Sequence, residues 1–415
     1  MKNIRNPLVL VAGLLIIVIS LAVVYRHFSS RETGPDTETE PQSVSQNDTD
    51  QPTVSDPIPS TIYAGTDELT VSEVMTGLDI PWDIAFTPDG VMLVNERAGK
   101  LTARLADGAF QAVEADFSDL SVRGELGLMG MVVDPRFVAN RRFYTCQGDG
   151  GTGQIKVVAW RISDDYTRAD RVDDPLVGGI PSASIHNGCR LRFGAEGYLW
   201  ISTGDAARGA SPQDLNSLGG KVLRVDAATG RAAPGNPFSG SENAELVYTF
   251  GHRNPQGLAW HSGTGRMWAV EHGPDVDDEI NLLIRGGNYG WDPASASSSY
   301  YQQVPMTDAV KYPDAIEASW LSGDPTLAVS GAIFLTGERW GGKEGWLAVA
   351  TLKDSRLYLF QFDEAGNLED SFTVPELDNT YGRLRTPMVG PDGALYISTS
   401  NGGGNDLVLR VAPSL

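Results

Sequence analysis

The sequence predicts an all-β fold, a six-bladed β-propeller with four-stranded antiparallel blades, preceded by an N-terminal transmembrane anchor. Three features of the 415 residues predict it: a repeated pair of short strands, few stretches with helical periodicity, and one long apolar run near the N-terminus. A hydrophobic content of 41% with only two Cys excludes a disulfide-stapled miniprotein and a wholly disordered chain.

Residues 1–30 are expected to anchor the chain in a membrane. The apolar run from Leu8 to Tyr25 has 18 residues, just enough for a helix to span a bilayer. Three basic residues and no acidic residue accompany it. No clear small-x-small cleavage site follows the run, so we expect an uncleaved anchor, with a cleaved signal peptide as the alternative.

Residues 31–61 are expected to form a disordered acidic linker. They contain seven acidic residues, one Arg, and many Ser, Thr, Pro and Gln. Such a composition buries too little apolar surface to offset the conformational entropy lost on folding. We therefore expect the globular part to occupy residues 62–415.

The globular part repeats one motif, a short alternating strand, a turn rich in Pro, Asp and Gly, and a second strand. Copies begin at Trp82, Leu128, Cys189, Gln256, Ser330 and Pro387. Alternation with period two around Asp-Gly turns is typical of antiparallel hairpins. Six copies indicate six blades, because radial repetition leaves only short, protected sheet edges. A pair of β-sandwiches is the rival architecture on pattern alone.

The charge balance limits the partners. The net charge is −21, from 53 acidic and 32 basic side chains. Nucleic acids and anionic lipid surfaces are bound through clustered Lys and Arg. We therefore expect no nucleic-acid partner.

His186 and Asp205 are candidates for acid–base chemistry. His186 stands just ahead of one predicted blade strand and Asp205 follows the next strand, so both are expected on loops at the same face. A carboxylate that reaches an imidazole orients the ring and raises its basicity, as a general base requires. A capping His and an Asp in an Asx-turn are the alternatives.

An acidic segment and a set of cations suggest ligands. Asp277, Asp278 and Glu279 follow a Gly-Pro bend and offer hard oxygen ligands suited to Ca²⁺, although a solvated acidic loop is the alternative. Later in the chain, cations stand at blade entrances, where they favour a polyanionic small ligand over separate surface ion pairs. These cations are Lys353, Arg383 and Arg385.

Together these motifs resemble the glucose/sorbosone dehydrogenase family, the soluble aldose dehydrogenases that use pyrroloquinoline quinone (PQQ). The resemblance covers about residues 70–412, and its most specific part runs from Gly251 to Trp291. That part contains Gly-His-Arg-Asn-Pro-Gln-Gly, Glu-His-Gly-Pro, Asp-Asp-Glu-Ile-Asn and Gly-Gly-Asn-Tyr-Gly-Trp. The resemblance implies oxidation of the anomeric C1 hydroxyl of an aldose to a lactone, with hydride transfer to PQQ and with Ca²⁺ polarising the quinone.

The resemblance also implies roles for matching residues. His186 matches the general base and Asp205 the carboxylate that supports it. Arg253 and Asn254 match the pair that contacts the quinone, and Gln213 matches a polar neighbour of the cofactor. The cations that match holders of the cofactor's carboxylates are Lys353, Arg383 and Arg385.

Two calcium sites are implied in the same way. Gly273 and Pro274 match backbone carbonyl ligands of the Ca²⁺ that bridges to the cofactor. Glu279 and Tyr289 match a second, structural Ca²⁺ site.

Two positions depart from the glucose-oxidising members of the family. Glu125 occupies a position that is Gln in well-known members, where the Gln contacts sugar and base. Ile185 precedes His186, where glucose-type enzymes have Asp. Both departures, with the shorter chain, are similar to the compact aldose sugar dehydrogenases of broad specificity. An added carboxylate beside His186 changes the electrostatics of the base or the sugar preference.

The implied location is the periplasmic side of the inner membrane, or the exterior if the N-terminal signal is cleaved. No Cys-x-x-Cys-His haem motif occurs, so we expect electrons to pass to a separate acceptor. In an oxidising compartment Cys146 and Cys189 can pair, but buried free thiols are equally compatible with the sequence.

Two other functions remain open on sequence. A Ca²⁺-dependent lactone hydrolase on a six-bladed propeller would use the acidic residues, but it leaves Lys353, Arg383 and Arg385 without a role. A binding module, like the ectodomain of hedgehog-interacting proteins, would need no catalytic His. Trp320 is expected in the core, with stacking on a sugar ring as the alternative.

Overall fold

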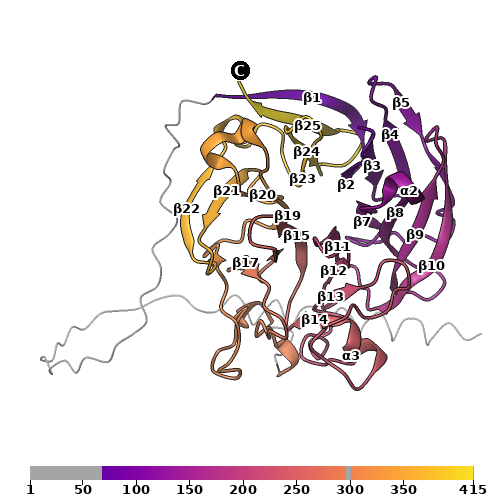
Figure 1. Cartoon of the computed structure of the whole chain (residues 1–415). Coiled ribbons are helices and arrows are strands. Elements are labelled where there is room, and N and C mark those ends of the chain that lie inside the picture. The colour runs from indigo at the N-terminus through magenta and orange to yellow at the C-terminus, as the bar shows by residue number, and fades with distance from the viewer. Residues whose placement is uncertain (1–67, 296–300, 415) are drawn as a thin grey trace, which may run out of the picture. The chain divides into compact units, whose positions relative to one another are not determined.

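The computed structural model describes residues 68–295 and 301–414, and they form six β-sheets arranged in a ring (Figure 1). The predicted six-bladed propeller is therefore confirmed, and the sandwich pair is wrong. The predicted anchor (1–30) and linker (31–61) lie outside the described residues. Within the described ranges, no helix combines the length and the apolarity needed to cross a bilayer.

The first three blades follow in chain order. Blade 1 consists of β2 (Pro81–Phe86), β3 (Met92–Glu96), β4 (Lys100–Arg104) and β5 (Phe110–Ala112). Blade 2 consists of β7 (Leu128–Val133), β8 (Arg142–Gly148), β9 (Ile155–Ile162) and β10 (Arg168–Ile180), with α2 (Phe137–Asn140) between β7 and β8. Blade 3 consists of β11 (Gly188–Phe193), β12 (Leu199–Thr203), β13 (Lys221–Val225) and β14 (Val247–Phe250), with α3 (Glu242–Leu246) before β14.

The other three blades complete the ring. Blade 4 consists of β15 (Pro255–His261), β16 (Arg266–Glu271), β17 (Glu279–Leu282) and β18 (Trp320–Leu321). Blade 5 consists of β19 (Val329–Phe334), β20 (Leu347–Thr351), β21 (Leu357–Phe362) and β22 (Leu368–Thr373). Blade 6 consists of β23 (Leu384–Val389), β24 (Leu395–Thr399), β25 (Asp406–Pro413) and β1 (Leu69–Leu78). Short 3₁₀ helices are η1 (Pro293–Ser295), η2 (Tyr301–Gln303), η3 (Glu338–Lys343) and η4 (Pro375–Leu377).

Two details differ from six identical four-stranded sheets. Blade 2 gains a fifth strand, β6 (Glu114–Ala115), which pairs parallel to β10. Blade 6 takes its outer strand from the other end of the chain, because β1 pairs antiparallel with β25 from Leu69–Pro413 to Leu78–Asp406. The ring is therefore closed by hydrogen bonds between the first and last strands.

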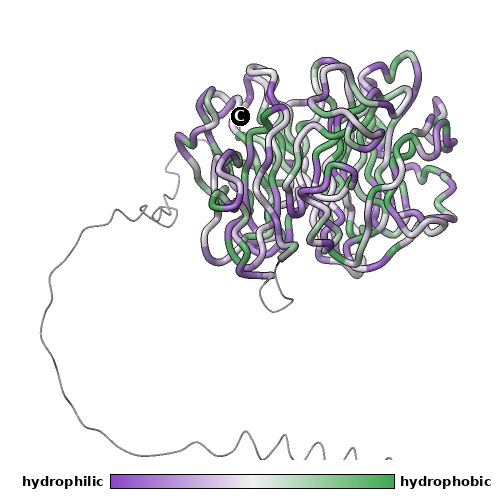
Figure 2. Tube along the Cα trace, turned by 90° about the horizontal axis from the view of Figure 1, so that it is seen from below, coloured by the Kyte–Doolittle hydropathy of each residue, from purple (hydrophilic) through white to green (hydrophobic). Residues whose placement is uncertain are grey.

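The hydrophobic core lies between the blades. Six clusters of buried side chains fill the six interfaces between adjacent blades. In β9, Val157 faces blade 3 while Val158 faces blade 1, as the period of two requires. Figure 2 shows hydrophobic segments inside the blades and hydrophilic ones mainly in the surrounding loops. Trp320 is 6% exposed and packs in the core against Phe360, so its predicted core position is confirmed.

Candidate active site

Strand pairing brings His186 and Asp205 to one end of blade 3. Gly188 of β11 pairs with Thr203 of β12, and each site residue lies two positions beyond this pair. Their loops approach so closely that a Cβ at Gly204 would lie 2.0 Å from the His186 carbonyl oxygen. Glycine at this position therefore permits the contact. His186 Nδ1 lies 2.8 Å from Asp205 Oδ1, as the sequence predicted for an oriented imidazole.

Asp205 is fully buried and accepts hydrogen bonds on both carboxylate oxygens. Besides His186, the Ala207 amide donates to Oδ1 at 2.7 Å, and the Trp291 indole and the Tyr301 hydroxyl each donate to Oδ2 at 2.9 Å. Burial alone would raise the pKa of Asp205, but the hydrogen bond and charge of His186, with the other donors, hold it below its usual range. Asp205 is therefore ionised, and it keeps the proton of His186 on Nδ1.

The other ring nitrogen of His186, Nε2, is left available. Within residues 68–295 and 301–414, no hydrogen bond to it is present, and His186 lines a cavity of about 540 Å³. Three other lining residues are polar, namely Arg253, Tyr301 and Gln302. The rest are small or apolar: Ile185, Ala207, Gly209, Ala210, Pro293 and Ala294. An unprotonated imidazole nitrogen at such a cavity can accept a proton from a bound hydroxyl group.

Arg253 and Asn254 precede β15 of the neighbouring blade, and hydrogen bonds fix their positions. Glu271 accepts the Arg253 amide at 2.9 Å, and the Arg253 guanidinium donates to the His272 carbonyl at 2.9 Å. The Asn254 side-chain oxygen accepts the Gly188 amide at 3.0 Å. Asn254 Nδ2 and Arg253 Nε are buried without a hydrogen-bond partner among the described residues. Buried donors without a partner are rare in proteins and point to a missing acceptor.

A second cavity, of about 490 Å³, lies at the axis of the propeller. It takes residues from the loops or strands at the same end of all six blades, including Trp82, Glu125, Gln256, Ala328 and Arg385. Ile185 lines both cavities, so the axial cavity adjoins the one that His186 faces. The two cavities together offer room for two ligands side by side.

The axial cavity is strongly cationic. Arg97, Arg383 and Arg385 line it, and Glu125 is the carboxylate among its lining residues. Burial, together with the charges of Arg190 and Arg383, lowers the pKa of Arg385 to about 9. Guanidinium groups gathered in this way favour an anionic ligand with several carboxylates.

Arg190 was missed by the sequence analysis. Its fully buried guanidinium lies 2.8 Å from Asp83 and 4.2 Å from the centre of the Trp82 ring. The Arg385 guanidinium lies 5.4 Å from the centre of the same ring. Arg190 therefore adds positive charge next to the axial cavity, and its position in an alternating strand gave no sign of this role.

Two predicted cofactor residues, Lys353 and Gln213, lie outside the lining of both cavities, whereas Glu125 lines the axial one. Lys353 is exposed and its ammonium lies 3.3 Å from the Thr326 hydroxyl, so it borders the axial cavity only through its neighbour Leu352. Gln213 exchanges two amide hydrogen bonds with Asn288, at 2.9 and 3.0 Å, and lines neither cavity. Glu125 accepts the backbone amide of His186 at 2.8 Å, so its contact is with the main chain of His186.

The predicted Gly273–Pro274 site is a tight turn. Asp278 Oδ1 accepts the Gly273 amide at 2.8 Å, and Asp278 Oδ2 accepts the Leu327 amide at 2.8 Å. A Cβ at Gly273 would lie 2.1 Å from the Val276 carbonyl oxygen, so glycine is required there. Asp278 thus fixes this turn through the backbone, which is a role that the acidic run alone did not indicate.

The Thr307 hydroxyl links Glu279 and Tyr289, the two residues predicted to bind a structural Ca²⁺. The Thr307 hydroxyl lies 3.3 Å from Glu279 Oε1 and 3.1 Å from the Tyr289 carbonyl oxygen. Burial, with the charge of Glu271, raises the pKa of Glu279 well above its usual range. Asn281 Oδ1 is buried beside this site without a partner among the described residues. Among residues 68–295 and 301–414, no three His, Cys, Asp or Glu side chains form a metal-binding group.

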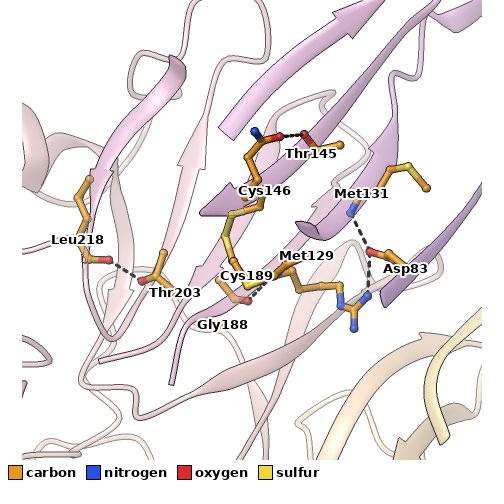
Figure 3. The surroundings of a disulfide bond; sticks show 12 residues. Asp83, Met129, Met131, Thr145, Cys146, Gly188, Cys189, Thr203 and Leu218 are labelled. Carbon is orange, nitrogen blue, oxygen red and sulfur yellow. Dashed lines mark hydrogen bonds and ion pairs between the residues drawn. A yellow bond between two sulfur atoms is a disulfide. The ribbon is translucent and has the colours of Figure 1, made fainter. Parts of the chain in front are cut away.

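Cys146 and Cys189 form a disulfide, which decides between the two alternatives left by the sequence. The bond joins β8 of blade 2 to β11 of blade 3, close to the hydrogen bond between Met131 and Asp83 (Figure 3). Cys189 is three residues after His186. The disulfide therefore ties the loop that carries His186 to the neighbouring blade.

Comparison with known proteins identifies sugar dehydrogenases as similar proteins. The family model described as Glucose / Sorbosone dehydrogenase matches residues 78–410. An aldose sugar dehydrogenase of Escherichia coli K12 is 30% identical over 368 residues, which cover 85% of this chain and 95% of that protein.

Solved structures agree with the sequence comparison. A putative oxidoreductase (glucose dehydrogenase) from Thermus thermophilus superimposes with a TM-score of 0.70 at 36% identity, covering 83% of this chain and 99% of that chain. The PQQ-bound form of an aldose sugar dehydrogenase from Streptomyces coelicolor superimposes with a TM-score of 0.68 at 29% identity, covering 84% and 99%.

Proposed function

We propose that this chain, which belongs to the glucose/sorbosone dehydrogenase family, oxidises the anomeric C1 hydroxyl of an aldose to the lactone, with PQQ as the hydride acceptor. One observation carries the proposal. The His186–Asp205 pair, 2.8 Å apart, borders a cavity that adjoins an arginine-lined cavity on the propeller axis. A base beside the first cavity and an anion site in the second are what the reaction requires.

The axial cavity fits PQQ, a planar quinone with three carboxylates. Arg253 lines the adjoining cavity that His186 faces, and its Nε, like Asn254 Nδ2, is a buried donor without a partner in the described chain, for which the cofactor would supply an acceptor. Arg383 and Arg385 would hold its carboxylates, and Gln256 would add an amide to the cavity wall. Two further residues would act from the margin. Lys353 would extend the cationic rim, and Gln213 would support the site through Asn288.

Calcium is part of the proposal. The carbonyls of Gly273 and Pro274 would hold one Ca²⁺, on a turn that Asp278 keeps fixed. Glu279 and the Tyr289 carbonyl would hold a second Ca²⁺, and Asn281 Oδ1, which has no partner in the described chain, would be a further oxygen ligand. Hard oxygen donors of this kind suit Ca²⁺.

The protein's own groups would have separate roles in the reaction. When bound, PQQ would supply the acceptor for the C1 hydrogen and its electron pair. His186 Nε2 accepts the proton of the C1 hydroxyl, while Asp205 holds Nδ1 and stabilises the imidazolium that forms. Arg253 lines the His186 cavity, and its positive charge would stabilise the negative charge that develops during the transfer. The hydroxyl proton and the two-electron hydride thus leave the sugar to different sites, and the lactone results.

The experiment is dye-linked aldose oxidation by the purified protein, assayed alone and after addition of PQQ with Ca²⁺. Activity should appear only with both additions and fall by about 10²–10⁴ in His186→Ala. His261→Ala serves as the matched control and should keep full activity, because His261 lies at the end of β15 away from Arg253 and Asn254. An absorbance titration should show PQQ binding to His186→Ala. Lack of binding and activity in the wild-type protein would refute the proposal.

Location and electron transfer complete the proposal. We propose that residues 1–30 anchor the protein on the periplasmic side of the inner membrane and that a separate acceptor takes the electrons. Deleting residues 1–30 should move the activity from the membrane fraction to the soluble fraction. Unchanged membrane association after the deletion would contradict the anchor.

A further inference from the structure

Tyr301 contacts both members of the His186–Asp205 pair, although its sequence surroundings gave no sign of a site. It begins η2, and its hydroxyl lies 2.9 Å from Asp205 Oδ2 and 3.4 Å from His186 Nδ1. Its ring stacks on the imidazole at 6.2 Å between centroids, with 24° between the planes. Tyr301 thus touches the base through its ring and the supporting carboxylate through its hydroxyl.

We propose that Tyr301 is a positioning residue that sets the protonation of His186. It does so by donating a hydrogen bond to Asp205, which weakens the attraction of that carboxylate for a protonated His186. This inference rests on the proposed function, in which His186 is the base. The two oxygens of Asp205 receive two donors each. His186 and Ala207 bind Oδ1, and Trp291 and Tyr301 bind Oδ2.

The direction of the effect follows from charge. An ionised carboxylate with no other donors attracts the imidazolium strongly and keeps the base protonated. Each hydrogen bond on Oδ2 draws negative charge away from Oδ1 and weakens that attraction. Burial and the charge of Asp205 raise the pKa of the Tyr301 hydroxyl, so it stays protonated and donates at every working pH. By donating to Oδ2, Tyr301 therefore weakens the attraction of the Asp205 carboxylate for an imidazolium at His186.

The other charged groups around His186 come from separate elements and are not changed by the test. Arg253 precedes β15 and lines the same cavity, and Glu125 precedes β7 and binds the His186 backbone. His272 follows β16, and burial with the charge of Arg253 lowers its pKa to about 3, so it is neutral at working pH. A shift caused by removing one hydroxyl can therefore be assigned to Tyr301.

The test is Tyr301→Phe, which removes the hydroxyl and keeps the ring. With PQQ and Ca²⁺ present, we expect the acid limb of the kcat profile to move to higher pH by about half a unit to one unit. The plateau kcat should change by less than about tenfold, because Asp205 still holds His186. Trp291→Phe, which removes the other Oδ2 donor, should move the limb in the same direction.

The matched control is Tyr144→Phe, because Tyr144 also donates to a buried carboxylate, Asp134, at 2.7 Å, but in blade 2. It should leave the acid limb unchanged. An unmoved limb in Tyr301→Phe, a limb moved to lower pH, or an equal shift in Tyr144→Phe would overturn the proposal.

A second readout needs no cofactor and no sugar. The ¹⁵N resonances of the His186 ring, followed through a pH titration of the protein without PQQ, report its protonation directly. The titration of His186 should move to higher pH in Tyr301→Phe by the same amount as the acid limb. A shift in this titration with no aldose oxidation in wild type would refute the proposed function but support the role of Tyr301; no shift would refute the role of Tyr301 whatever the activity.

Discussion

Two adjacent blades contain the same His–carboxylate pair, yet one pair faces a cavity and the other is sealed in the core. In blade 3, His186 and Asp205 are 19 residues apart in sequence and 2.8 Å apart in space. In blade 4, His252 and Glu271 are also 19 residues apart in sequence and lie 2.9 Å apart. The repeat places a His before an inner strand and an acid at or just after the end of the next strand, so the blades generate both pairs.

The difference between the pairs lies at the second ring nitrogen. His252 Nε2 is bound to the Thr249 hydroxyl at 2.9 Å, and its ring stacks on Tyr289 in a fully buried site. The corresponding nitrogen of His186 faces a cavity. Glu271 holds the Arg253 backbone as well as His252. A His–carboxylate pair is thus a structural support when both nitrogens are satisfied, and a candidate base when one is free.

The largest effect should come from removing the open imidazole. In His186→Ala, kcat for aldose oxidation with PQQ and Ca²⁺ should fall by about 10²–10⁴, the usual contribution of a general base. The midpoint of denaturant unfolding should stay close to that of wild type. A loss of stability with unchanged kcat would place His186 among the structural residues.

The closed pair should show the opposite response. Glu271→Ala leaves the donors of His252 and Arg253 without an acceptor in the core and removes one of the two acceptors of Asn281, so the free energy of unfolding should fall by about 3–5 kcal/mol. Urea unfolding followed by tryptophan fluorescence measures this change. Ile84→Val, a small core change in another interface, serves as the control and should cost about 1 kcal/mol. Wild-type stability in Glu271→Ala would contradict the supporting role.

The disulfide distinguishes the two pairs further, because it ties β11, which begins two residues after His186, to β8 of blade 2 and uses both Cys of the chain. Changing Cys146 and Cys189 together to Ser should lower the free energy of unfolding by about 2–4 kcal/mol, since the unfolded chain gains freedom. KM for the aldose should rise more than the affinity for PQQ falls, because Cys189 lies near His186. A rise in KM equal to the fall in PQQ affinity would show that the disulfide supports the whole end of the propeller that holds the two cavities.

The smallest effect concerns pH. The pKa of Asp205 lies below its usual 3.8 in the folded protein, so its ionised form stabilises the fold above about pH 4, and this contribution is lost as the pH falls through the lowered value. In Asp205→Asn, the decline of stability below pH 4 should therefore be shallower than in wild type. Urea unfolding at pH 3–6 measures both slopes. Identical slopes would show that Asp205 gains nothing from its four donors.

The blade pattern and the pair in blade 3 were predictable because they depend on local alternation and on strand ends. Six two-strand copies became six blades, and the positions of His186 and Asp205 followed from the pairing of Gly188 with Thr203. Contacts between distant segments were not predictable. Tyr301 is 115 residues from His186 and lies outside any strand, and no local period marks it.

The burial of charged side chains in the inner strands could also not be predicted from the sequence. Arg190 stands in an alternating strand where its burial depends on Asp83 of blade 1. Lys353 and Gln213 matched the family pattern, yet their side chains lie at the rim and behind the site. A matching position fixes the backbone location, whereas the direction of a side chain depends on neighbours from other blades.

A single-turnover experiment tests the central claim most directly. The protein loaded with PQQ and Ca²⁺ is mixed with an aldose in the absence of an electron acceptor, and the quinone absorbance is followed for sugar with hydrogen or deuterium at C1. We predict loss of the quinone absorbance in wild type, slower with deuterium at C1, and slower by about 10²–10⁴ in His186→Ala. An unchanged quinone spectrum in the wild-type protein with bound PQQ would contradict the assignment of the His186 cavity to aldose oxidation.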